Sequence, residues 1–507
     1  SLERVFRRRD ICIRSSGAGP PCSSLPPSQR LSPIFMKELY DLAVIGAGSA
    51  GYAAARTAAG LGLKVAVVEG GERVGGLCIL RGCMPTKTML ESAHRNFEIG
   101  RAKEFGIRVG KPKPDWKAIL KRKDRLIREF AEYRKGQLEK GRFTFFRAQA
   151  SFLSAERLQL TGVGKGKVPQ EIQAKTFLIS TGSRTAKREI PGLEEAGYWT
   201  SDECLHASKQ VKSLIVLGGR AVALEFAQYY AHLGVKVTVI QRSSQLLPES
   251  DPEVGQELEK VFREHGTQVF CGTQILRVVR RGKNKRVEFI QAGKRRYVEA
   301  EQILQALGRE PDLSGLAVEK AGVRLVQGKV HSELTQQTSV PHIFAAGDVC
   351  GPYEVVHLAI QQGEVAAKNA GDWIRGRELQ AVMDYRLKLE VIFTSPEVAS
   401  VGLSEKECKE KGLDILSGSY PFAYHGKSMV MGATDGFVKL IALRKGGEII
   451  GAQVVGPHAS DLIHELVAVI RYRGTAKEVA EMPHYHPTLS EIWTYPAEEI
   501  AEKISTY

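Results

Sequence analysis

The sequence predicts an α/β fold in which two similar strand–turn–helix–strand units precede a C-terminal α+β domain. A glycine-rich turn follows an apolar strand near residue 46, and the same succession of elements returns near residue 218. From about Tyr385 the pattern changes to strands and helices that are typical of an α+β domain. The 507 residues are enough for several domains that each bury a core.

The first unit begins with an apolar strand, Tyr40–Ile45. It continues through the turn Gly46-Ala47-Gly48-Ser49-Ala50-Gly51 and an alanine-rich helix to Leu61, and its second strand ends at Glu69. A GxGxxG turn alone is a weak signal. In this order, with an acid about 20 residues further on, it indicates a Rossmann-like dinucleotide site. The glycines let backbone amides at a helix start approach a pyrophosphate, and Glu69 can accept hydrogen bonds from ribose hydroxyls.

The second unit repeats this order with altered residues. A strand, Val211–Leu217, precedes Gly218-Gly219-Arg220-Ala221-Val222-Ala223, and a helix to Leu233 leads into the strand Val235–Ile240. Arg220 stands where the close-approach glycine belongs, and Ala223 replaces the third glycine. The Arg220 side chain could form a salt bridge with a phosphate or block the pocket.

The residues after the second strand of this unit bear on the choice of nicotinamide. Proteins that bind NAD usually carry an acid here, whereas this chain has Gln241-Arg242-Ser243. Losing the carboxylate and gaining a cation favours the 2′-phosphate of NADPH. The alternative is a neutral Gln241 that serves NAD.

Two cysteines, Cys78 and Cys83, lie between these units with four residues between them. Five steps of a regular helix advance about 7.5 Å, which exceeds the Cα separation of about 4.4–6.8 Å that a disulfide requires. The pair can therefore close only if the helix start is distorted, which Gly82 permits, while Pro85 suits a first helical turn. A thiol at the positive end of a helix is reactive, so we predict a redox pair; the alternative is two inert buried thiols.

The spacing of the cysteines and the length of the apolar stretches argue against a secreted disulfide scaffold and against a membrane-spanning protein. Only the pair at 78 and 83 has a redox spacing, which indicates a reducing compartment rather than a secreted disulfide scaffold. The eight cysteines are Cys12, Cys22, Cys78, Cys83, Cys204, Cys271, Cys350 and Cys408. No apolar stretch approaches the roughly 20 residues of a membrane span, so we expect no membrane partner.

The net charge of +15 raises the question of a nucleic-acid partner. Part of the charge lies between Arg101 and Arg147, including Lys121-Arg122-Lys123 and Arg134-Lys135. No interleaved aromatic residues or DNA-binding motif accompany it. We therefore expect a solvated helix face, no nucleic acid and no bound metal.

Residues 1–35 differ from the rest of the chain, being rich in Arg, Ser and Pro and without hydrophobic periodicity. They predict a disordered extension, with a mitochondrial transit peptide as the alternative. The corresponding location is the cytoplasm or, with a transit peptide, the mitochondrial matrix. Further elements expected are a helical stretch over Trp116–Lys140, strands within 143–153 and 159–178, and a strand from Thr338 that ends in Asp348.

These motifs together resemble the class I pyridine nucleotide-disulfide oxidoreductases, most closely the dihydrolipoamide dehydrogenase branch. The second nucleotide motif is similar to that of mercuric reductases. Besides the Gly46 turn, the cysteine pair and the Asp348 strand, four segments carry the resemblance. They are Thr181-Gly182-Ser183, Ala306-Leu307-Gly308-Arg309, Phe393-Thr394-Ser395-Pro396-Glu397 and His484-Tyr485-His486-Pro487-Thr488-Leu489-Ser490-Glu491.

The resemblance implies two cofactors, FAD on the first unit and NAD(P) on the second. The residues that it places at FAD are Gly46, Gly48, Gly51, Glu69, Lys87, Ala150 on the adenine side, Thr181, Gly182, Gly347 and Asp348. Those placed at NAD(P) are Gly218, Arg220, Gln241, Arg242 and Gly308.

The resemblance also implies the catalytic roles. Cys83 matches the thiol beside the flavin, and Cys78 matches the thiol that meets substrate. Lys87, near the flavin ring, would pair with Glu225 and stabilise negative charge on the reduced flavin. His486 would be the acid/base, because a dithiol must lose a proton before it attacks a disulfide.

Glu491 would orient the His486 ring, whereas His484 is expected to be structural.

The expected domains are a 1–35 extension, an FAD-binding part at 36–190, an NAD(P)-binding domain at 191–312, a central FAD-binding part at 313–385 and a dimerisation domain at 386–507. The C-terminal domain of one subunit would complete the site of the other, which predicts a homodimer with shared active sites. The function expected is electron transfer between a small dithiol or disulfide substrate and NAD(P)H through FAD and the Cys78–Cys83 disulfide.

The resemblance leaves alternatives open. The first is an NADPH-dependent reductase of glutathione or another small disulfide. Mercuric ion is disfavoured, because the chain ends without a cysteine pair and keeps His486. A non-enzymatic flavoprotein subunit has Arg220 as its only support.

Overall fold

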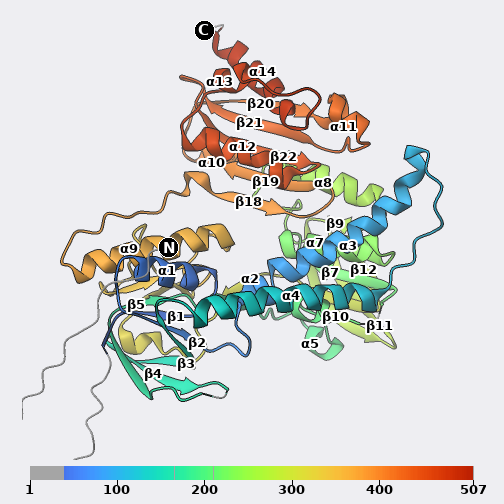
Figure 1. Cartoon of the computed structure of the whole chain (residues 1–507). Coiled ribbons are helices and arrows are strands. Elements are labelled where there is room, and N and C mark those ends of the chain that lie inside the picture. Colours follow the sequence, from blue (N-terminus) through green and yellow to red (C-terminus); the bar gives the residue numbers. More distant parts are fainter. Residues whose placement is uncertain (1–38, 165, 209, 506–507) are drawn as a thin grey trace, which may run out of the picture. The chain divides into compact units, whose positions relative to one another are not determined.

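The computed structural model describes residues 39–505 apart from 165 and 209 (Figure 1). The expectations for residues 1–35 therefore lie outside the described residues. Three main sheets form the described part of the chain, and the first of them takes its last strand, Ile343–Ala345, from beyond the second unit. Clusters of buried hydrophobic residues lie beside each of the three sheets. The predicted fold class, two Rossmann-like units and a C-terminal α+β domain, is confirmed.

The first sheet is parallel in its centre, with the order β3-β2-β1-β5-β17. Strands β3 and β5 continue beyond it and pair with β4 in an antiparallel meander. The strands are β1 (Leu39–Ile45), β2 (Val65–Glu69), β3 (Thr144–Ser154), β4 (Arg157–Gly162), β5 (Glu171–Ile179) and β17 (Ile343–Ala345). Near-continuous apolar runs such as that of β2 suit strands that are covered on both faces.

Two helices, α1 (Ser49–Gly60) and α9 (Val356–Ile374), pack against each other beside this sheet (Figure 1). The buried residues of α1 are alanines and one glycine, so its backbone can come close to its neighbour. A Cβ at Gly363 of α9 would lie 2.2 Å from the Ala50 carbonyl oxygen. This close packing fixes the start of α1 at the carboxyl edge of the sheet, where a pyrophosphate is expected.

One predicted strand is much shorter than expected. The segment from Thr338 was predicted as a continuous strand, but only Ile343–Ala345 pairs in the sheet. The chain turns back before it, because the Thr338 amide donates to the Ile343 carbonyl and the Ile343 amide donates to the Val340 carbonyl. Pro341, which has no amide hydrogen, lies in this turn.

The second unit is a parallel sheet with the order β13-β7-β8-β9. Its strands are β7 (Ser213–Leu217), β8 (Lys236–Ile240), β9 (Gln268–Phe270) and β13 (Gln302–Gln305), and its helices are α7 (Ala221–His232) and α8 (Pro252–Glu264). An antiparallel sheet follows, formed by β10 (Thr273–Arg281), β11 (Asn284–Gln291) and β12 (Lys294–Ala300).

The C-terminal domain is a five-stranded antiparallel sheet with the order β18-β19-β22-β21-β20. The strands are β18 (Leu389–Ile392), β19 (Glu397–Gly402), β20 (Ile415–Pro421), β21 (Phe437–Leu443) and β22 (Ile449–Gly456). The helices are α10 (Glu405–Glu410), α11 (Gly426–Val430), α12 (Ala459–Arg471), α13 (Ala476–Glu481) and α14 (Thr494–Ser505). Trp493, fully buried, anchors the segment before α14 in this core.

Three helices connect the units: α2 (Gly76–Leu80), α3 (Cys83–Arg101) and α4 (Trp116–Glu139). Helix α3 packs against α4 and α7. None of the helices in the described part of the chain combines the length and apolar character that crossing a membrane requires.

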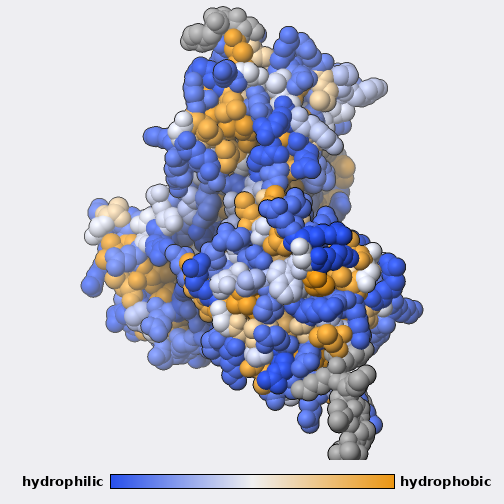
Figure 2. Space-filling view, turned by 90° about the vertical axis from the view of Figure 1, so that its left-hand side faces the viewer, coloured by the Kyte–Doolittle hydropathy of each residue, from blue (hydrophilic) through white to orange (hydrophobic). Residues whose placement is uncertain are grey.

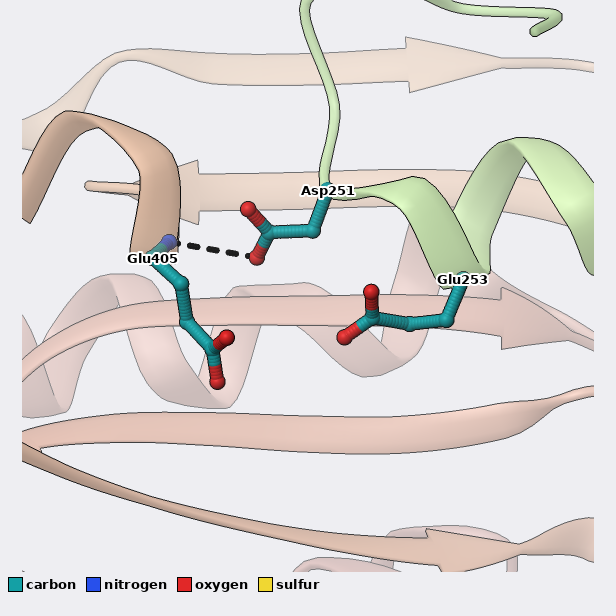
Figure 3. Close-up of side chains that lie close together, drawn as sticks. All are labelled: Asp251, Glu253 and Glu405. Carbon is teal, nitrogen blue, oxygen red and sulfur yellow. Dashed lines mark hydrogen bonds between the residues drawn. The ribbon is translucent and has the colours of Figure 1, made fainter. Parts of the chain in front are cut away.

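A buried ammonium group joins the second unit to the C-terminal domain. Lys439 of β21 pairs with Asp251 at 3.1 Å, with Glu405 at 3.0 Å and with Glu253. Figure 3 shows the three carboxylates converging from α8 and α10. Burial opposes the Lys439 charge, but the carboxylates outweigh it and raise the pKa of Lys439. The three carboxylates thus form a structural ion cluster around a protein cation.

The contact between α3 and α7 includes a buried histidine. The His232 ring, at the end of α7, stacks on Phe97 with the ring centroids 4.1 Å apart. Burial lowers the pKa of His232 to about 3, and the neighbouring His265 and His94 add to the effect. Because this value lies below 6.5, folding favours the neutral ring, and stability is lost as pH falls below the unfolded-state pKa.

We expect His232 to lower the free energy of unfolding by about 2 kcal/mol between pH 7 and pH 5. His232→Phe should remove this part of the pH dependence while keeping the stack on Phe97. Denaturant unfolding of both proteins at the two pH values measures the difference, with His206→Gln, at an exposed histidine, as the control. Equal pH dependence of the wild type and His232→Phe would contradict the assignment.

Candidate active site

The two cysteines lie on either side of a break between two helices. Cys78 belongs to α2, Cys83 is the first residue of α3, and Gly82 lies in the break. A Cβ at Gly82 would lie 3.0 Å from the Leu77 carbonyl oxygen and 3.4 Å from the Cys78 Cα. The distorted helix start predicted from the spacing is thus present, and glycine allows the close approach.

The two free thiols share a hydrogen bond, and their acidities differ. The hydrogen bond from Cys78 lowers the pKa of Cys83 to about 7; burial opposes this change and the Lys87 ammonium adds to it. The same hydrogen bond and burial raise the pKa of Cys78 well above its ordinary value. Cys83 therefore loses its proton first, as expected of a thiol at a helix N-terminus.

Lys87 lies one turn along α3 from Cys83 and is held by Glu225 of α7. Its Nζ donates to both carboxylate oxygens, at 2.8 and 2.7 Å. Glu225 is buried and also accepts a hydrogen bond from the Phe393 amide at 3.1 Å. The Lys87 ammonium lies 4.8 Å from the centre of the Phe393 ring. Residues from three parts of the chain thus fix this cation beside the thiols.

The start of α1 offers the features that a dinucleotide pyrophosphate requires. Gly46 has φ +95°, and a Cβ there would lie 2.5 Å from the Ser180 carbonyl oxygen. Gly48 is the N-cap residue, and no side chain caps the first amides of this helix. Free amides at a helix N-terminus bind phosphate.

The surrounding side chains also fit FAD. Glu69 accepts hydrogen bonds from the Ala47 and Gly71 amides, which leaves further lone pairs for a ribose. The Thr181 hydroxyl, just after β5, is buried without a hydrogen-bond partner in the described part of the chain. The Asp348 carboxylate accepts a hydrogen bond from Ser183, at 2.6 Å, whose hydroxyl accepts one from Arg309. An unpaired buried hydroxyl and an uncapped helix are features that a bound dinucleotide would satisfy.

The remaining residues assigned to FAD lie in the same first unit. Gly51 follows in α1, Ala150 lies on β3, Gly182 follows Thr181, and Gly347 precedes Asp348.

In the second nucleotide-binding unit, a carboxylate pairs with one of the two arginines that were expected to meet NAD(P). Gly218 directly follows β7 and has φ +122°, and Arg220 is the N-cap residue of α7. The exposed Arg220 side chain pairs with Glu249. The Gln241 side chain lies over Gly219, where a Cβ would be 2.9 Å from it, whereas Arg242 is exposed. Gly308 lies beyond β13 near Arg188.

His486 and Glu491 meet in the C-terminal domain. His486 Nδ1 lies 2.9 Å from Glu491 Oε2, and the ring is 79% exposed. The side chain of His484 instead lies largely covered beside Glu465, 2.8 Å away. The hydrogen bonds and ion pairs found for His486 and Glu491 among the described residues stay within this domain and do not reach the cysteines.

Sequence reasoning missed one residue here, His425. This fully buried histidine lies 3.3 Å from the second oxygen of Glu491. It belongs to no motif that the sequence analysis identified, and 66 positions separate it from Glu491 (491 − 425). No local signal could have found this contact.

The basic helix α4 is not entirely solvated, in contrast to the expectation. Lys123 is buried, and its ammonium donates to the Leu205 carbonyl at 2.7 Å. The Arg134 guanidinium lies 4.0 Å from the centre of the Tyr52 ring and favours the charged form of Cys78. Arg134 falls in phase with the buried Ile127 and Leu138, so helical periodicity could have predicted its inward position.

Comparison with known proteins agrees with these features. Residues 40–363 match the model of the family described as pyridine nucleotide-disulphide oxidoreductase, and residues 389–497 match the dimerisation domain of that family. A dihydrolipoyl dehydrogenase from Chlamydia muridarum is 34% identical over 467 residues, which cover 91% of this chain and 97% of the relative. One from Bacillus subtilis is 33% identical over 462 residues, covering 89% and 96%.

Solved structures show the same fold. LpdA from Mycobacterium tuberculosis has a TM-score of 0.80 and 26% identity, covering 90% of this chain and 99% of that one. The Cu(II) complex of the flavoprotein disulfide reductase RclA from Escherichia coli has a TM-score of 0.78 and 24% identity, covering 92% and 99%. At this identity the RclA likeness concerns the fold alone.

These matches confirm the family resemblance that the motifs predicted. Both family models match in the order in which the sheets occur, and the relatives are matched over nearly their whole length. The chain therefore belongs to the pyridine nucleotide-disulphide oxidoreductase family, as an FAD- and NAD(P)-dependent disulfide oxidoreductase with that family's dimerisation domain.

Proposed function

We propose that the protein acts as a dihydrolipoyl dehydrogenase, oxidising a small dithiol and delivering the electron pair to a nicotinamide. The thiol pair carries this proposal: the Cys78 and Cys83 thiols interact, and the pKa of Cys83 is lowered to about 7 by Cys78 and the Lys87 ammonium. The curated relatives named dihydrolipoyl dehydrogenase support the choice of substrate.

The proposed reaction begins with the Cys78–Cys83 pair in its disulfide form. A substrate thiolate attacks the Cys78 sulfur, the Cys78–Cys83 bond breaks, and Cys83 leaves as a thiolate. A leaving thiol with a pKa of about 7 departs faster than an ordinary one. The second substrate thiolate then attacks the mixed disulfide, which releases the oxidised substrate and reduced Cys78.

His486 would take the proton that each substrate thiol must lose. Glu491, 2.9 Å from Nδ1, would fix the tautomer and leave Nε2 to accept that proton. FAD, which the start of α1, Glu69 and Asp348 would hold, would supply two-electron transfer between the reduced cysteines and the nicotinamide. Lys87, held by Glu225, would stabilise the negative charge that develops there.

We propose that two subunits share each active site. The exposed His486 and its separation from the thiols within one chain support this, as does the matched dimerisation domain. Figure 2 shows apolar surface on the C-terminal domain, in the upper part of the view. Large exposed apolar side chains of this domain are Tyr424, Met429, Val430, Tyr472 and Tyr485.

The positions of the sheets support domain limits at 36–190, 191–312, 313–385 and 386–507.

For the nicotinamide we propose a preference for NADP(H) over NAD(H). The exposed Arg242 supports it, because a cation beside the ribose can pair with a 2′-phosphate. Arg220 contributes less, since Glu249 already pairs with it. The exposed Arg242 also favours a second candidate function, an NADPH-dependent reductase of a small disulfide. In that reaction the electrons run in the opposite direction, from NADPH to the substrate.

A substrate panel tests these proposals. We expect oxidation of dihydrolipoamide with NAD and NADP, faster at limiting concentration with NADP, and little consumption of NADPH with oxidised glutathione. Arg242→Ala should raise the KM for NADP roughly tenfold, the loss of about one charged contact, and leave the KM for NAD nearly unchanged. Turnover of glutathione disulfide alone would favour the second candidate. Bound FAD without activity on either substrate would contradict both.

A further inference from the structure

One carboxylate in the C-terminal domain faces two histidines. Glu491 Oε2 lies 2.9 Å from His486 Nδ1, and Oε1 lies 3.3 Å from His425 Nε2. His486 is largely exposed, whereas His425 is fully buried and Glu491 is 9% exposed. The two oxygens are thus divided between a ring that can meet substrate and a ring that cannot.

The Glu491 carboxylate, which only accepts, and a buried hydroxyl, which can donate, together set the tautomer of His425. Ser428, also fully buried, lies 2.8 Å from His425 Nδ1. If the Ser428 hydroxyl donates to Nδ1, the ring carries its proton on Nε2 and donates toward Glu491. The opposite tautomer would turn a lone pair of Nε2 toward the carboxylate. We therefore assign the proton to Nε2 from the network.

The groups facing His425 keep its ring neutral. Burial lowers the pKa of His425, against the opposing effect of Glu491, and His486 adds to the lowering. Among the described residues, the rings of Phe422 and Tyr495 also stand edge-on to His425, with centroids 6.4 Å away. A neutral buried ring that offers one N–H is a donor to Glu491 and is not itself a base.

We propose that His425 is a positioning residue that holds the Glu491 carboxylate toward His486 through the chain Ser428–His425–Glu491–His486. The inference rests on the acid–base role proposed for His486. At 3.3 Å the contact lies just beyond the usual hydrogen-bond range of about 2.7–3.2 Å. Nε2 makes no hydrogen bond among the described residues, so this contact becomes a hydrogen bond only when it shortens as the reaction site is assembled. The donor also draws part of the carboxylate charge away from His486.

Removing this donor has two physical consequences. One carboxylate oxygen of the buried Glu491 loses its partner, so the side chain is no longer fixed. The whole negative charge then acts on His486, which favours its protonated form. Dithiol oxidation needs His486 unprotonated, so the acid limb of its pH profile moves to higher pH.

The variant pair His425→Leu and His425→Gln separates positioning from packing. Leucine has no donor, whereas the glutamine amide can place an N–H near the position of Nε2. The first readout needs no substrate: the rate of carbethoxylation of His486 by diethyl pyrocarbonate, measured against pH by peptide mass spectrometry on the FAD-loaded protein. The second is the pH profile of kcat/KM for dihydrolipoamide.

We expect His425→Leu to move both midpoints up by about 0.5–1 pH unit and to lower kcat roughly tenfold. The midpoints of His425→Gln should lie within about 0.3 pH unit of the wild-type values. Those of Ser428→Ala should fall between the wild-type values and those of His425→Leu. Unchanged midpoints in His425→Leu, or identical shifts in the leucine and glutamine variants, would overturn the proposal. If His425→Leu does not fold, the comparison of Ser428→Ala with the wild type decides in the same way.

The two readouts distinguish this inference from the proposed function. Wild-type protein that oxidises no dithiol but shows the carbethoxylation shift in His425→Leu would contradict the proposed function and support the His425 contact. Wild-type protein that oxidises dihydrolipoamide without any midpoint shift in the variant would support the function and overturn the role of His425.

Discussion

Cys83→Ser is expected to lower dihydrolipoamide turnover by at least about a thousandfold while FAD remains bound. Serine keeps the shape of the helix start but cannot form a disulfide with Cys78, and its hydroxyl is not ionised near neutral pH. Because the pKa of the Cys83 thiol is about 7, the wild type has a large thiolate fraction at neutral pH that this variant loses. Steady-state assays with the flavin spectrum recorded on the same samples measure both effects.

Cys271→Ser is the matched control for this experiment. Cys271 is another partly buried free thiol, but burial, with Glu259 adding, raises its pKa to about 12. Its replacement should change turnover less than about twofold. Substantial dithiol turnover by Cys83→Ser would refute the electron route through the cysteine pair, whereas loss of FAD from that variant would assign Cys83 a structural role.

His486→Gln is expected to lower kcat/KM for dihydrolipoamide by about 10²–10³-fold. The amide cannot accept a proton near neutral pH, so the substrate dithiol must ionise without a base. Turnover should recover partly at high pH, where the dithiol ionises by itself. A profile of kcat/KM against pH for the wild type and the variant measures the effect.

His484→Gln controls for the loss of a histidine in the same segment. His484 is held by Glu465 at 2.8 Å and by the Met482 carbonyl at 3.0 Å, away from Glu491. Its replacement should lower kcat/KM less than about threefold, through stability alone. Equal losses in the two variants would show that His486 acts through the fold of this segment and not as a base.

Structural features that depend only on residues close together in the chain were predictable from the sequence. The turn at Gly46 follows an apolar strand, and the structure has β1 and α1 there with only small differences at the ends. The cysteine spacing predicted a broken helix start, because helical rise and disulfide geometry conflict over five residues. The fold class followed from such local patterns taken in order, and the family and the two cofactors followed from the resemblance that these motifs carry.

Contacts between distant segments were not predictable from local patterns. The strand expected from Thr338 is short because the chain turns back on itself, and Lys439 is buried because three carboxylates from the start of α8 and from α10 surround it. The inward position of Arg134 follows from its helical phase, but its partner Tyr52, 82 positions earlier (134 − 52), could not be read from the helix. In each case a charge or a backbone group finds its partner only after helices and sheets have packed.

The two Rossmann-like units, the cysteine pair at 78 and 83 and the His486–Glu491 segment could be identified from the chain alone, because short-range geometry and side-chain chemistry follow from neighbouring residues. The family resemblance also implied the pairing of Lys87 with Glu225, which the structure contains across 138 positions. Packing alone placed His425 against the second oxygen of Glu491. Packing brings these groups out of water together, and the low polarity of that environment makes their mutual contacts strong.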